Sequence, residues 1–578
     1  MQIAEPLQSA KYLVPLVVGV TGHRDLHPDE VGDIRGLIVA FFGKLRESFP
    51  GTPLRLMTAL AEGADRLAAH AAIDSGVEVQ IVLPMPGASY REDFASMASK
   101  AEFDELVSGR DVIELPVPAS EQEALAAPGP RRDLLYANAG MFISAHCHIL
   151  LAVWDCVKSD NIGGTSQIIY FQHYDRLPGV AESVPRTSLF LTDDESDLVY
   201  EIKCSRGNSG SSDLREQRPQ ACWFTTDPDA PRTEEMPPRY MRVFDRADEY
   251  NRDIAQALAA HPTVESALTS RPEPRHVAAA VPIRGFFVIA DRLANRFQGR
   301  VDLTLGGLYA LALLTGLTFI FYSELDGLDP LILVFLAFMV VGIVLAGIAK
   351  RRQWHRKYLD YRVLAEGLRV QYFWSIAGVR GEGYTKFAYD NFLRQRDMEL
   401  GWIRNVMRVA GTLNDAQPTK GNNSDLQFTI DEWIGSEQSR GQLDYYRYKT
   451  ARRARINRIT AVITRVCLWG GIGVAVVLAA SLGEIGEGTQ SYLIILMGVL
   501  PLIAGIAEVY TQRKADRELV KQYRFMEHVF ANARRRLAQA GSNAERREVL
   551  LGLGEAALSE HAEWILVHRE RQPESGGL

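Results

Sequence analysis

Uninterrupted apolar stretches are the clearest pattern along this chain. Four segments contain no charged residue, and each approaches the roughly 20 residues that an α-helix needs to cross the ~30 Å core of a bilayer. The alternative is a set of buried helices in a soluble domain, but such helices rarely stay free of charge on every face for so long. The sequence therefore predicts four membrane spans in two hairpins, at residues 304–322, 330–349, 466–483 and 491–507.

Charges beside the spans predict how the hairpins are oriented. Basic residues precede and follow each hairpin, whereas both connecting loops, SELDGLD at 323–329 and EIGEG at 484–488, carry only acidic charge. Because basic flanks stay on the cytoplasmic side, we expect both termini and the middle segment to be cytoplasmic and the chain to be a multi-pass protein of the cell inner membrane. No span has a central Lys, Asp or His, which argues against an ion-coupled transporter.

Each hairpin is followed by a long helical pattern, which suggests a duplicated unit. The sequence predicts an all-α membrane domain made of residues 280–410 and 430–570, each a hairpin plus a cytoplasmic helix. Residues 411–427, rich in Asn, Asp and Gly, are expected to form a loop. The first cytoplasmic helix carries a seam spaced by four and three residues, typical of a helix packed on a partner helix: Trp354, Tyr358, Tyr361, Ala365, Leu368 and Tyr372.

The N-terminal part alternates short apolar runs with amphipathic segments. Strands are expected at residues 13–20, 54–60, 77–84, 111–116 and 148–155, with helices at 27–49, 64–76, around 134–145, and at 166–174. Continuously apolar strands alternating with helices predict an α/β domain over residues 1–265, with a parallel sheet covered on both faces. Residues 184–238 are predicted to be a β-rich insertion, either a lid or an oligomer contact.

Candidate ligand residues follow the predicted strands, where parallel sheets bind ligands. Glycines let the backbone turn close to a phosphate, arginines can fork onto it, and carboxylates suit sugar hydroxyls. The alternative for the glycines is a turn without a ligand, and for the carboxylates a role at the helix start. The candidates are Gly19, Thr21, Gly22, His23, Arg24, Glu62, Gly63, Asp65, Pro84, Tyr90, Arg91, Trp154, Asp155, Gly163, Gly164 and Thr165.

Composition narrows the classes of partner. Hydrophobic residues make up 47% of the 578 residues, and the net charge of −7 argues against nucleic acid as the main partner. The five cysteines show no CxxC spacing, so neither a disulfide framework nor a zinc site is indicated and a reducing compartment fits. His146 and His148 fall on one face of a predicted strand with no third ligand in view. We therefore expect no metal and no required cofactor.

These motifs resemble a known family. The segments GVTGHRDL, ALAEGADRLA, IVLP, and LLAVWD followed by GGT are similar to the SLOG superfamily, whose Rossmann-like fold binds nucleotides. The hairpins with their helices resemble SLATT proteins, the SLOG-associated transmembrane effectors of bacterial conflict systems. The resemblance covers about residues 10–175 and 280–570. It implies a SLOG-like domain that senses a nucleotide-derived signal, such as an NAD- or ADP-ribose-type molecule, joined to a membrane effector.

One loop departs from the enzymatic members of that family. Those that cleave N-glycosidic bonds carry PGGxGTxxE, whereas this chain has NIGGTSQII and no glutamate three places after Thr165. The catalytic glutamate of those enzymes is thus missing, so enzymatic activity is not the leading hypothesis and no catalytic residue is assigned. If hydrolysis occurs, Glu62 is the best remaining candidate for the carboxylate. The leading hypothesis is a homo-oligomeric pore that permeabilises the membrane in antiphage defence. The alternatives are a membrane-anchored nucleotide hydrolase and a nucleotide-regulated transporter.

Overall fold

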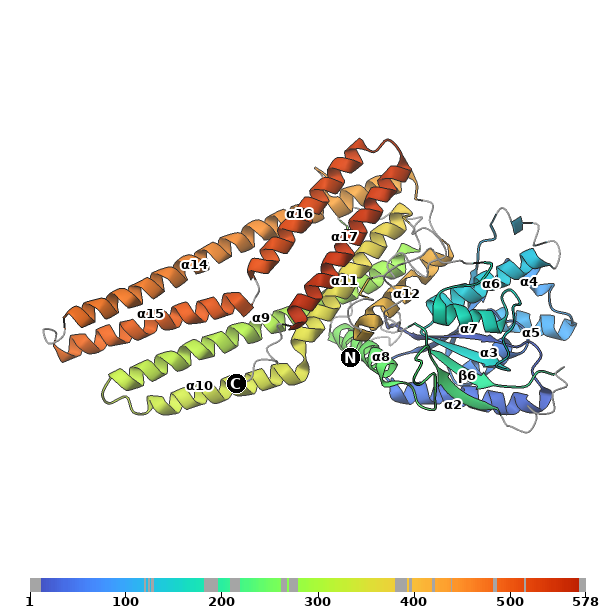
Figure 1. Ribbon diagram of the computed structural model, residues 1–578, viewed down its shortest axis with the longest axis horizontal. Coiled ribbons are helices and arrows are strands. Elements are labelled where there is room, and N and C mark those ends of the chain that lie inside the picture. The colour runs from blue at the N-terminus through green and yellow to red at the C-terminus, as the bar shows by residue number, and fades with distance from the viewer. Residues whose placement is uncertain are drawn as a thin grey trace, which may run out of the picture. The chain divides into compact units, whose positions relative to one another are not determined.

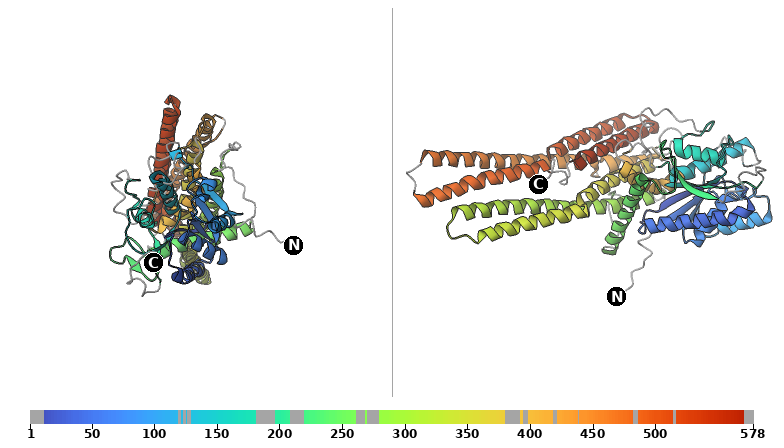
Figure 2. Two further views of the ribbon diagram at one scale, coloured as in Figure 1. Left: turned by 90° about the vertical axis from the view of Figure 1, so that its right-hand side faces the viewer. Right: turned by 60° about the horizontal axis from the view of Figure 1, so that its bottom comes forward.

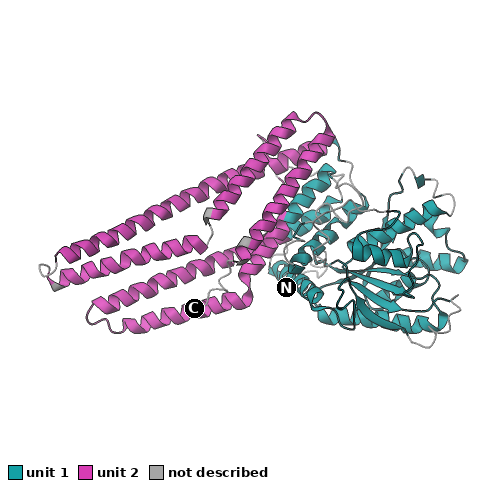
Figure 3. Cartoon of the chain, in the orientation of Figure 1, with its two compact units in different colours: residues 1–266, 274–289, 367–422 teal, residues 267–273, 290–366, 423–578 magenta. Residues whose placement is uncertain are grey.

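The computed structural model divides the chain into two compact units, coloured separately in Figure 3. Unit 1 comprises residues 1–266, 274–289 and 367–422, and unit 2 the remainder. Residues 367–422, which follow the first hairpin, thus belong to the same unit as the N-terminal part. The structure describes residues 12–118, 121–122, 125, 129–180, 196–207, 219–260, 268–269, 279–379, 392–393, 398–417, 421–437, 439–481, 486–513 and 516–570.

A mostly parallel sheet forms the centre of unit 1 (Figure 1). Among the described residues it has eight strands in the order β4-β3-β2-β1-β5-β6-β7-β8, in which β4 to β6 are parallel and β7 and β8 antiparallel. The α/β fold with a parallel sheet is therefore confirmed for this part. The strands are β1 (Leu16–Gly22), β2 (Leu54–Thr58), β3 (Glu78–Leu83), β4 (Asp111–Glu114), β5 (Ile149–Trp154), β6 (Val199–Lys203), β7 (Gln220–Phe224) and β8 (Arg232–Thr233).

The chain changes direction at β1, and this change places helices on both faces. From β1 to β4 it moves toward one edge, and it then returns to β5 on the other side of β1. Because crossovers between parallel strands are right-handed, the two directions put their helices on opposite faces. The helices are η1 (Pro28–Glu30), α2 (Val31–Ser48) and α3 (Ala64–Asp74), then α4 (Gly87–Arg91) and α5 (Met97–Val107), and on the return α6 (Pro130–His146) and α7 (Thr165–Tyr174).

Strands β6 to β8 continue the same sheet. β6 pairs in parallel with β5, and β7 returns antiparallel beside it. The described part of 184–238 is β-rich as expected, but it extends the main sheet instead of forming a separate insertion. The apolar run DLVYEIK is buried between neighbouring strands, which local patterning does not distinguish from a strand in a separate sheet. The remaining residues, 184–195 and 208–218, lie outside the described part.

Two helices close the amino-terminal side of the sheet. In α8 (Pro238–Ala260), Asn251 bonds both the amide and the carbonyl oxygen of Val14, each at 2.9 Å. In α12 (Gly401–Ala416, after η4 at Met398–Leu400), Asp415 lies 3.3 Å from His146, just before β5. The prediction of a loop over 411–427 is wrong for its described ends, because α12 continues to Ala416 and α13 (Asn423–Thr429) follows. Tertiary burial of the α12 face outweighs the local loop preference.

Unit 2 consists of helices and contains the apolar spans (Figures 1 and 2). Four helices are long and apolar enough to cross a membrane: α9, α10, α14 and α15, which match the two predicted hairpins. At most 6% of the most apolar window of each helix is buried inside the protein, which is consistent with helices that cross a membrane. The helices are α9 (Ala280–Glu324), α10 (Leu331–Arg352), α11 (Trp354–Ala377), η5 (Ile430–Ile434), α14 (Gln442–Ala480), α15 (Glu487–Arg513), α16 (Asp516–Gln539) and α17 (Asn543–Glu570).

Glycines set the close contacts between spans. A Cβ atom at Gly471 of α14 would lie 2.8 Å from the ring of Pro501 in α15, and one at Gly316 of α9 would lie 2.6 Å from Leu502. Helix α15 therefore packs against both α14 and α9 at one level. Such small-residue contacts let helix backbones approach where lipid gives no hydrophobic driving force.

Outside the spans, ion pairs fasten α17 to α11 within unit 2. Asp360 is fully buried and accepts from Arg569 at 2.8 Å, and Glu366 lies 3.5 Å from His561. Arg362 links the same stretch of α11 to Asp291 of α9 at 3.2 Å. The cytoplasmic helix predicted after the first hairpin is thus joined to two partner helices.

Candidate functional site

The loops after β1 and β5 meet where the chain changes direction, the usual binding position in open α/β sheets. His23 Nε2 lies 3.0 Å from Asp155 Oδ1 and 3.1 Å from the Asp155 amide nitrogen. Depending on which ring nitrogen holds the proton, Nε2 donates to the carboxylate or accepts from the amide. Both side chains are about 13–14% exposed, so this pair sits at the surface end of the two strands.

The loop after β2 packs directly on the loop after β1. Gly63 has φ +80°, and a Cβ there would lie 2.5 Å from the carbonyl oxygen of His23 and 2.4 Å from that of Arg24. The amide of Ala64 donates to His23 O at 3.1 Å. Gly22 approaches the same helix start, since its Cβ would lie 2.4 Å from Ala64 Cβ. Only glycine has room for these contacts, and only glycine readily adopts the φ of Gly63. Both glycines therefore bring the start of α3 against the carboxyl ends of the strands, called the carboxyl edge of the sheet below.

Asp65 is buried beneath this loop and not presented on its surface. It is 6% exposed and accepts from Thr58 Oγ1 at 3.3 Å and from the backbone amides of Ala59 and Ala61. Burial raises the pKa of Asp65 to about 7, although those hydrogen bonds and the charge of Arg24 act to lower it. A buried carboxyl that titrates near neutrality is a common mark of functional sites.

Arg24 is an exposed cation at this edge. Its guanidinium lies over the ring of Tyr136 in α6, 5.4 Å from the centroid, and no ion pair to it is found within the described part of the chain. Burial and a hydrogen bond to Asp93 raise the pKa of Tyr136 to about 12, so the phenol stays neutral. The arrangement leaves a guanidinium available to a phosphate.

The glycine loop before α7 reaches the same part of α6. A Cβ at Gly163, where φ is +73°, would lie 2.9 Å from the amide nitrogen of Ala137, next to Tyr136. Gly164 precedes the first residue of α7, Thr165, which is 8% exposed. The Gly163 amide already donates to Gln167 Oε1 at 3.2 Å. The loop therefore contacts α6, the helix whose Tyr136 lies under Arg24, although one of the loop's amides is already hydrogen-bonded within it.

The candidate ligand residues after β3 are engaged in packing or in ion pairs of their own. Tyr90 is buried against Phe94 and Phe103, and burial together with the charge of Asp65 raises the pKa of its phenol. Arg91 forms a forked pair with Asp104, with nitrogen–oxygen distances of 2.9–3.0 Å. Pro84 follows the end of β3 and is buried. Of these residues, only Tyr90 shares the neighbourhood of Asp65.

Four further candidates have structural partners. The indole of Trp154 donates to Glu201 of β6 at 3.0 Å, on the side away from β1. Gly19 lies inside β1, where a Cβ would be 2.8 Å from Ile143 of α6, and Thr21 pairs with Ala152 of β5. Glu62 accepts from the hydroxyl of Ser99 in α5. These contacts hold the strands and helices together near the carboxyl edge of the sheet, and the Glu62 carboxylate is part-buried there.

Two buried arginines that the sequence analysis did not single out link helices α3 and α6 to the segments after β3. Arg132 in α6 donates to Ser89 O at 2.8 Å and pairs with Asp93 at 2.8 Å. Arg66 donates to Ser99 and pairs with Glu102 at 2.8 Å, and its guanidinium lies 4.3 Å from the Phe94 ring centroid. Arg132 and Tyr136 are spaced i, i+4, a pattern that places both on one helix face, but nothing local says that this face meets the strand ends.

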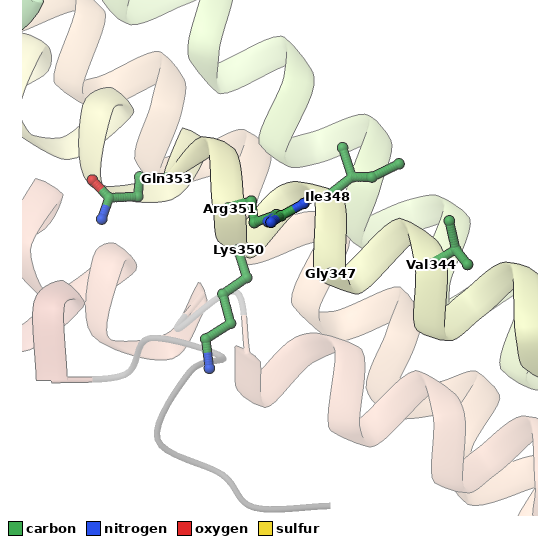
Figure 4. A pocket seen from close by; sticks show the side chains of 6 residues that line it. All are labelled: Val344, Gly347, Ile348, Lys350, Arg351 and Gln353. Carbon is green, nitrogen blue, oxygen red and sulfur yellow. The ribbon is translucent and has the colours of Figure 1, made fainter.

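Unit 2 has a surface hollow that combines apolar residues with cations. Val344, Gly347 and Ile348 form its apolar side, and Lys350, Arg351 and Gln353 its polar end (Figure 4). The Lys350 side chain extends away from α10 in that view. Cations at the end of an apolar helix are typical of a lipid headgroup region. Among the described residues, no group of three or more His, Cys, Asp or Glu side chains could hold a metal ion.

The fold is thus an α/β unit, with candidate binding loops at the carboxyl ends of its strands, joined to four helices that are long and apolar enough to span a membrane. Comparison of the chain with protein-family models, curated proteins and solved structures finds no match. The resemblance to SLOG proteins therefore rests on the sequence motifs alone, and that to SLATT proteins on the pattern of two hairpins that are each followed by a long helix.

Proposed function

We propose that this protein is a membrane effector gated by a nucleotide-derived ligand. The observation that carries the proposal is the meeting of three turns at the point where the sheet changes direction: Gly63 of the loop after β2, which packs against the loop after β1, the His23–Asp155 pair, and Gly163 beside α6. Arg24 supplies the charge for a phosphate at this edge. An NAD- or ADP-ribose-type molecule would supply the phosphates for Arg24 and the glycine turns to bind.

The effector half of the proposal rests on the helices that continue between the two units. Helix α9 contributes residues 280–289 to unit 1 and 290–324 to unit 2, and α11 contributes 354–366 to unit 2 and 367–377 to unit 1. Both are continuous helices, so they are the natural couplers between ligand and span. The ligand must bind one arrangement of the protein more tightly than another, and the favoured arrangement then makes a homo-oligomer permeable. Both termini would be cytoplasmic in an inner membrane.

Dye release from liposomes tests this function. Full-length protein would be reconstituted with trapped dye, and NAD or ADP-ribose added outside or inside. The proposal expects leakage that depends on ligand and is lost in Arg24→Gln. Arg55→Gln is a suitable control, because Arg55 pairs with Glu78 away from the carboxyl edge. Leakage unchanged in Arg24→Gln would contradict the assigned pocket.

A membrane-anchored nucleotide hydrolase is a second candidate, favoured by one observation. Asp65 has a pKa raised to about 7 by burial, the range in which a carboxyl can act as a general acid or base. Its burial beneath the loop argues against direct contact with substrate. Chromatography of the same liposome reactions distinguishes the two: consumption of nucleotide without leakage supports the hydrolase.

A further inference from the structure

The surface hollow at the end of α10 has an apolar side that leads to a cationic end (Figure 4). Val344, Ile348 and Arg351 are spaced i, i+4 and i+7, which places all three on one face of the helix. Val344 and Ile348 are 54% and 46% exposed, and their side chains extend to the same side of α10 in Figure 4. An exposed apolar stripe on this face therefore ends at a guanidinium.

A glycine leaves the hollow open. Gly347 lines it, and a Cβ atom added there would meet no other element of the described chain within 4 Å. Gln353 closes the polar end: α10 ends at this residue with a φ of +48°, and the Gln353 side-chain oxygen accepts from Arg356 Nε of α11 at 2.9 Å. The hollow therefore has free space beside Gly347 and a polar end that is fastened to α11.

The cations at this end of α10 are not engaged by the protein itself. Among the residues that the structure describes, no ion pair or hydrogen bond involves the side chains of Lys350, Arg351 or Arg352, and all three are exposed. The next arginine along the chain differs, because Arg356 pairs with the buried Asp360 at 3.1 Å. Uncompensated positive charge is therefore concentrated where the apolar part of α10 ends.

We propose that this hollow binds an anionic phospholipid, with the phosphate at Lys350 and Arg351 and an acyl chain along Val344 and Ile348. The inference requires that α10 lies in a bilayer, but it does not depend on the nucleotide site. Cations suit a phosphate, and exposed aliphatic side chains suit an acyl chain. A zwitterionic lipid fits less well, because its own cation would face Lys350 and Arg351. A free phosphate would leave the apolar side of the hollow without a partner.

Native mass spectrometry of the full-length protein in a non-ionic detergent tests the site. Phosphatidylglycerol and phosphatidylcholine with the same acyl chains would be added over a range of concentrations, and the lipid retained by the protein measured. A basic residue beside an anionic headgroup contributes a factor of about five in affinity. We therefore expect phosphatidylglycerol to bind at least about fivefold more tightly than phosphatidylcholine.

Two matched pairs of variants locate the lipid. Arg351→Gln should weaken phosphatidylglycerol binding about fivefold, whereas Arg352→Gln removes the same charge outside the hollow and should change it less than about twofold. Gly347→Leu fills the open space without a clash and should weaken binding to a similar extent as Arg351→Gln. Gly342→Leu is its control, since Gly342 also has open space on α10 but does not line the hollow. Leucine favours a helix over glycine, and thermal unfolding confirms that each variant is folded.

Three results would overturn the inference. Equal binding of the two lipids would remove the preference for an anionic headgroup. Equal losses in Arg351→Gln and Arg352→Gln would mean that the charge at the end of α10 attracts anionic lipid diffusely and not through the hollow. Displacement of phosphatidylglycerol by inorganic phosphate, with full binding in Gly347→Leu, would assign a free anion to the cations. None of these results bears on leakage caused by a nucleotide, so the proposed function is tested separately.

Discussion

Gly63 lies so close to Arg24 that a Cβ atom added to it would be 2.4 Å from the Arg24 carbonyl oxygen. The positive φ of Gly63 and this backbone contact together fix the start of α3 against the loop after β1. The position of Arg24 at the edge is thus set by backbone packing, and its side chain remains exposed.

Replacing Gly63 by alanine tests this contact. Gly63→Ala should destabilise unit 1 by about 3 kcal/mol, because the φ strain and the displacement of two carbonyl groups add. Gly36→Ala is the control: Gly36 is exposed in α2 with open space around it, so its change should be within about 1 kcal/mol and favourable. Thermal unfolding, with hydrogen exchange of α3 peptides, measures both. Equal effects would mean that the contact is not strained.

Arg24 and Arg91 should differ as ligand contacts, although both were candidates. Arg24→Ala is expected to weaken ADP-ribose binding at least about tenfold, the loss expected for a charge-assisted hydrogen bond, with little change in stability. Arg91→Ala breaks the exposed pair with Asp104 and should leave affinity within about twofold. Calorimetry of both variants provides the comparison. An equal loss in Arg91→Ala would extend the site to α4.

The contact of α17 with α11 should weaken as the pH rises. Burial acts to lower the pKa of His561, but the charge of Glu560 and the hydrogen bond to Glu366 outweigh it and raise the pKa overall. A raised histidine pKa contributes stability that is present below its unfolded value of about 6.5 and lost as the pH rises through the folded value.

Hydrogen exchange of α17 peptides measures this loss. Between about pH 6 and pH 9, protection of α17, corrected for the intrinsic rate, should decrease in wild type and change less in His561→Gln. His528→Gln serves as the control, because His528 is exposed and hydrogen-bonds the carbonyl of Arg524 in its own helix. A wild-type slope in His561→Gln would contradict the assignment.

The proposed orientation of the hairpins can be tested with single cysteines. An impermeant maleimide should modify Asp326→Cys and Gly488→Cys in intact cells, because both positions lie in the loops that carry acidic charge. Ser542→Cys, between α16 and α17, should react only after the membrane is opened. Wild type, whose five cysteines are free, is the control and should stay unlabelled in intact cells. The reverse pattern would invert the topology.

Periodicity predicted the parallel strands and the spans well, since both signals are local. The strand expected at 148–155 is β5 at Ile149–Trp154, and the span expected at 330–349 corresponds to α10, which begins at Leu331 after the N-cap Pro330. The loop expected over 411–427 was wrong because α12 gains its stability from burial of Trp402, Val406 and Ala410, which composition near its end does not reveal. The same limitation made β6 and β7 look like a separate insertion.

The sequence alone determined which segments are apolar for the full thickness of a bilayer, which alternate as strands and helices, and where glycine and arginine follow a strand. Those properties depend on neighbours within a few residues. Only the tertiary structure decided which of the candidate side chains share one place. It joined His23 to Asp155, left Arg24 exposed, buried Asp65, and gave Arg91 and Trp154 to other partners. The physical reason is that strand order, helix packing and desolvation are set by contacts between residues far apart in the chain.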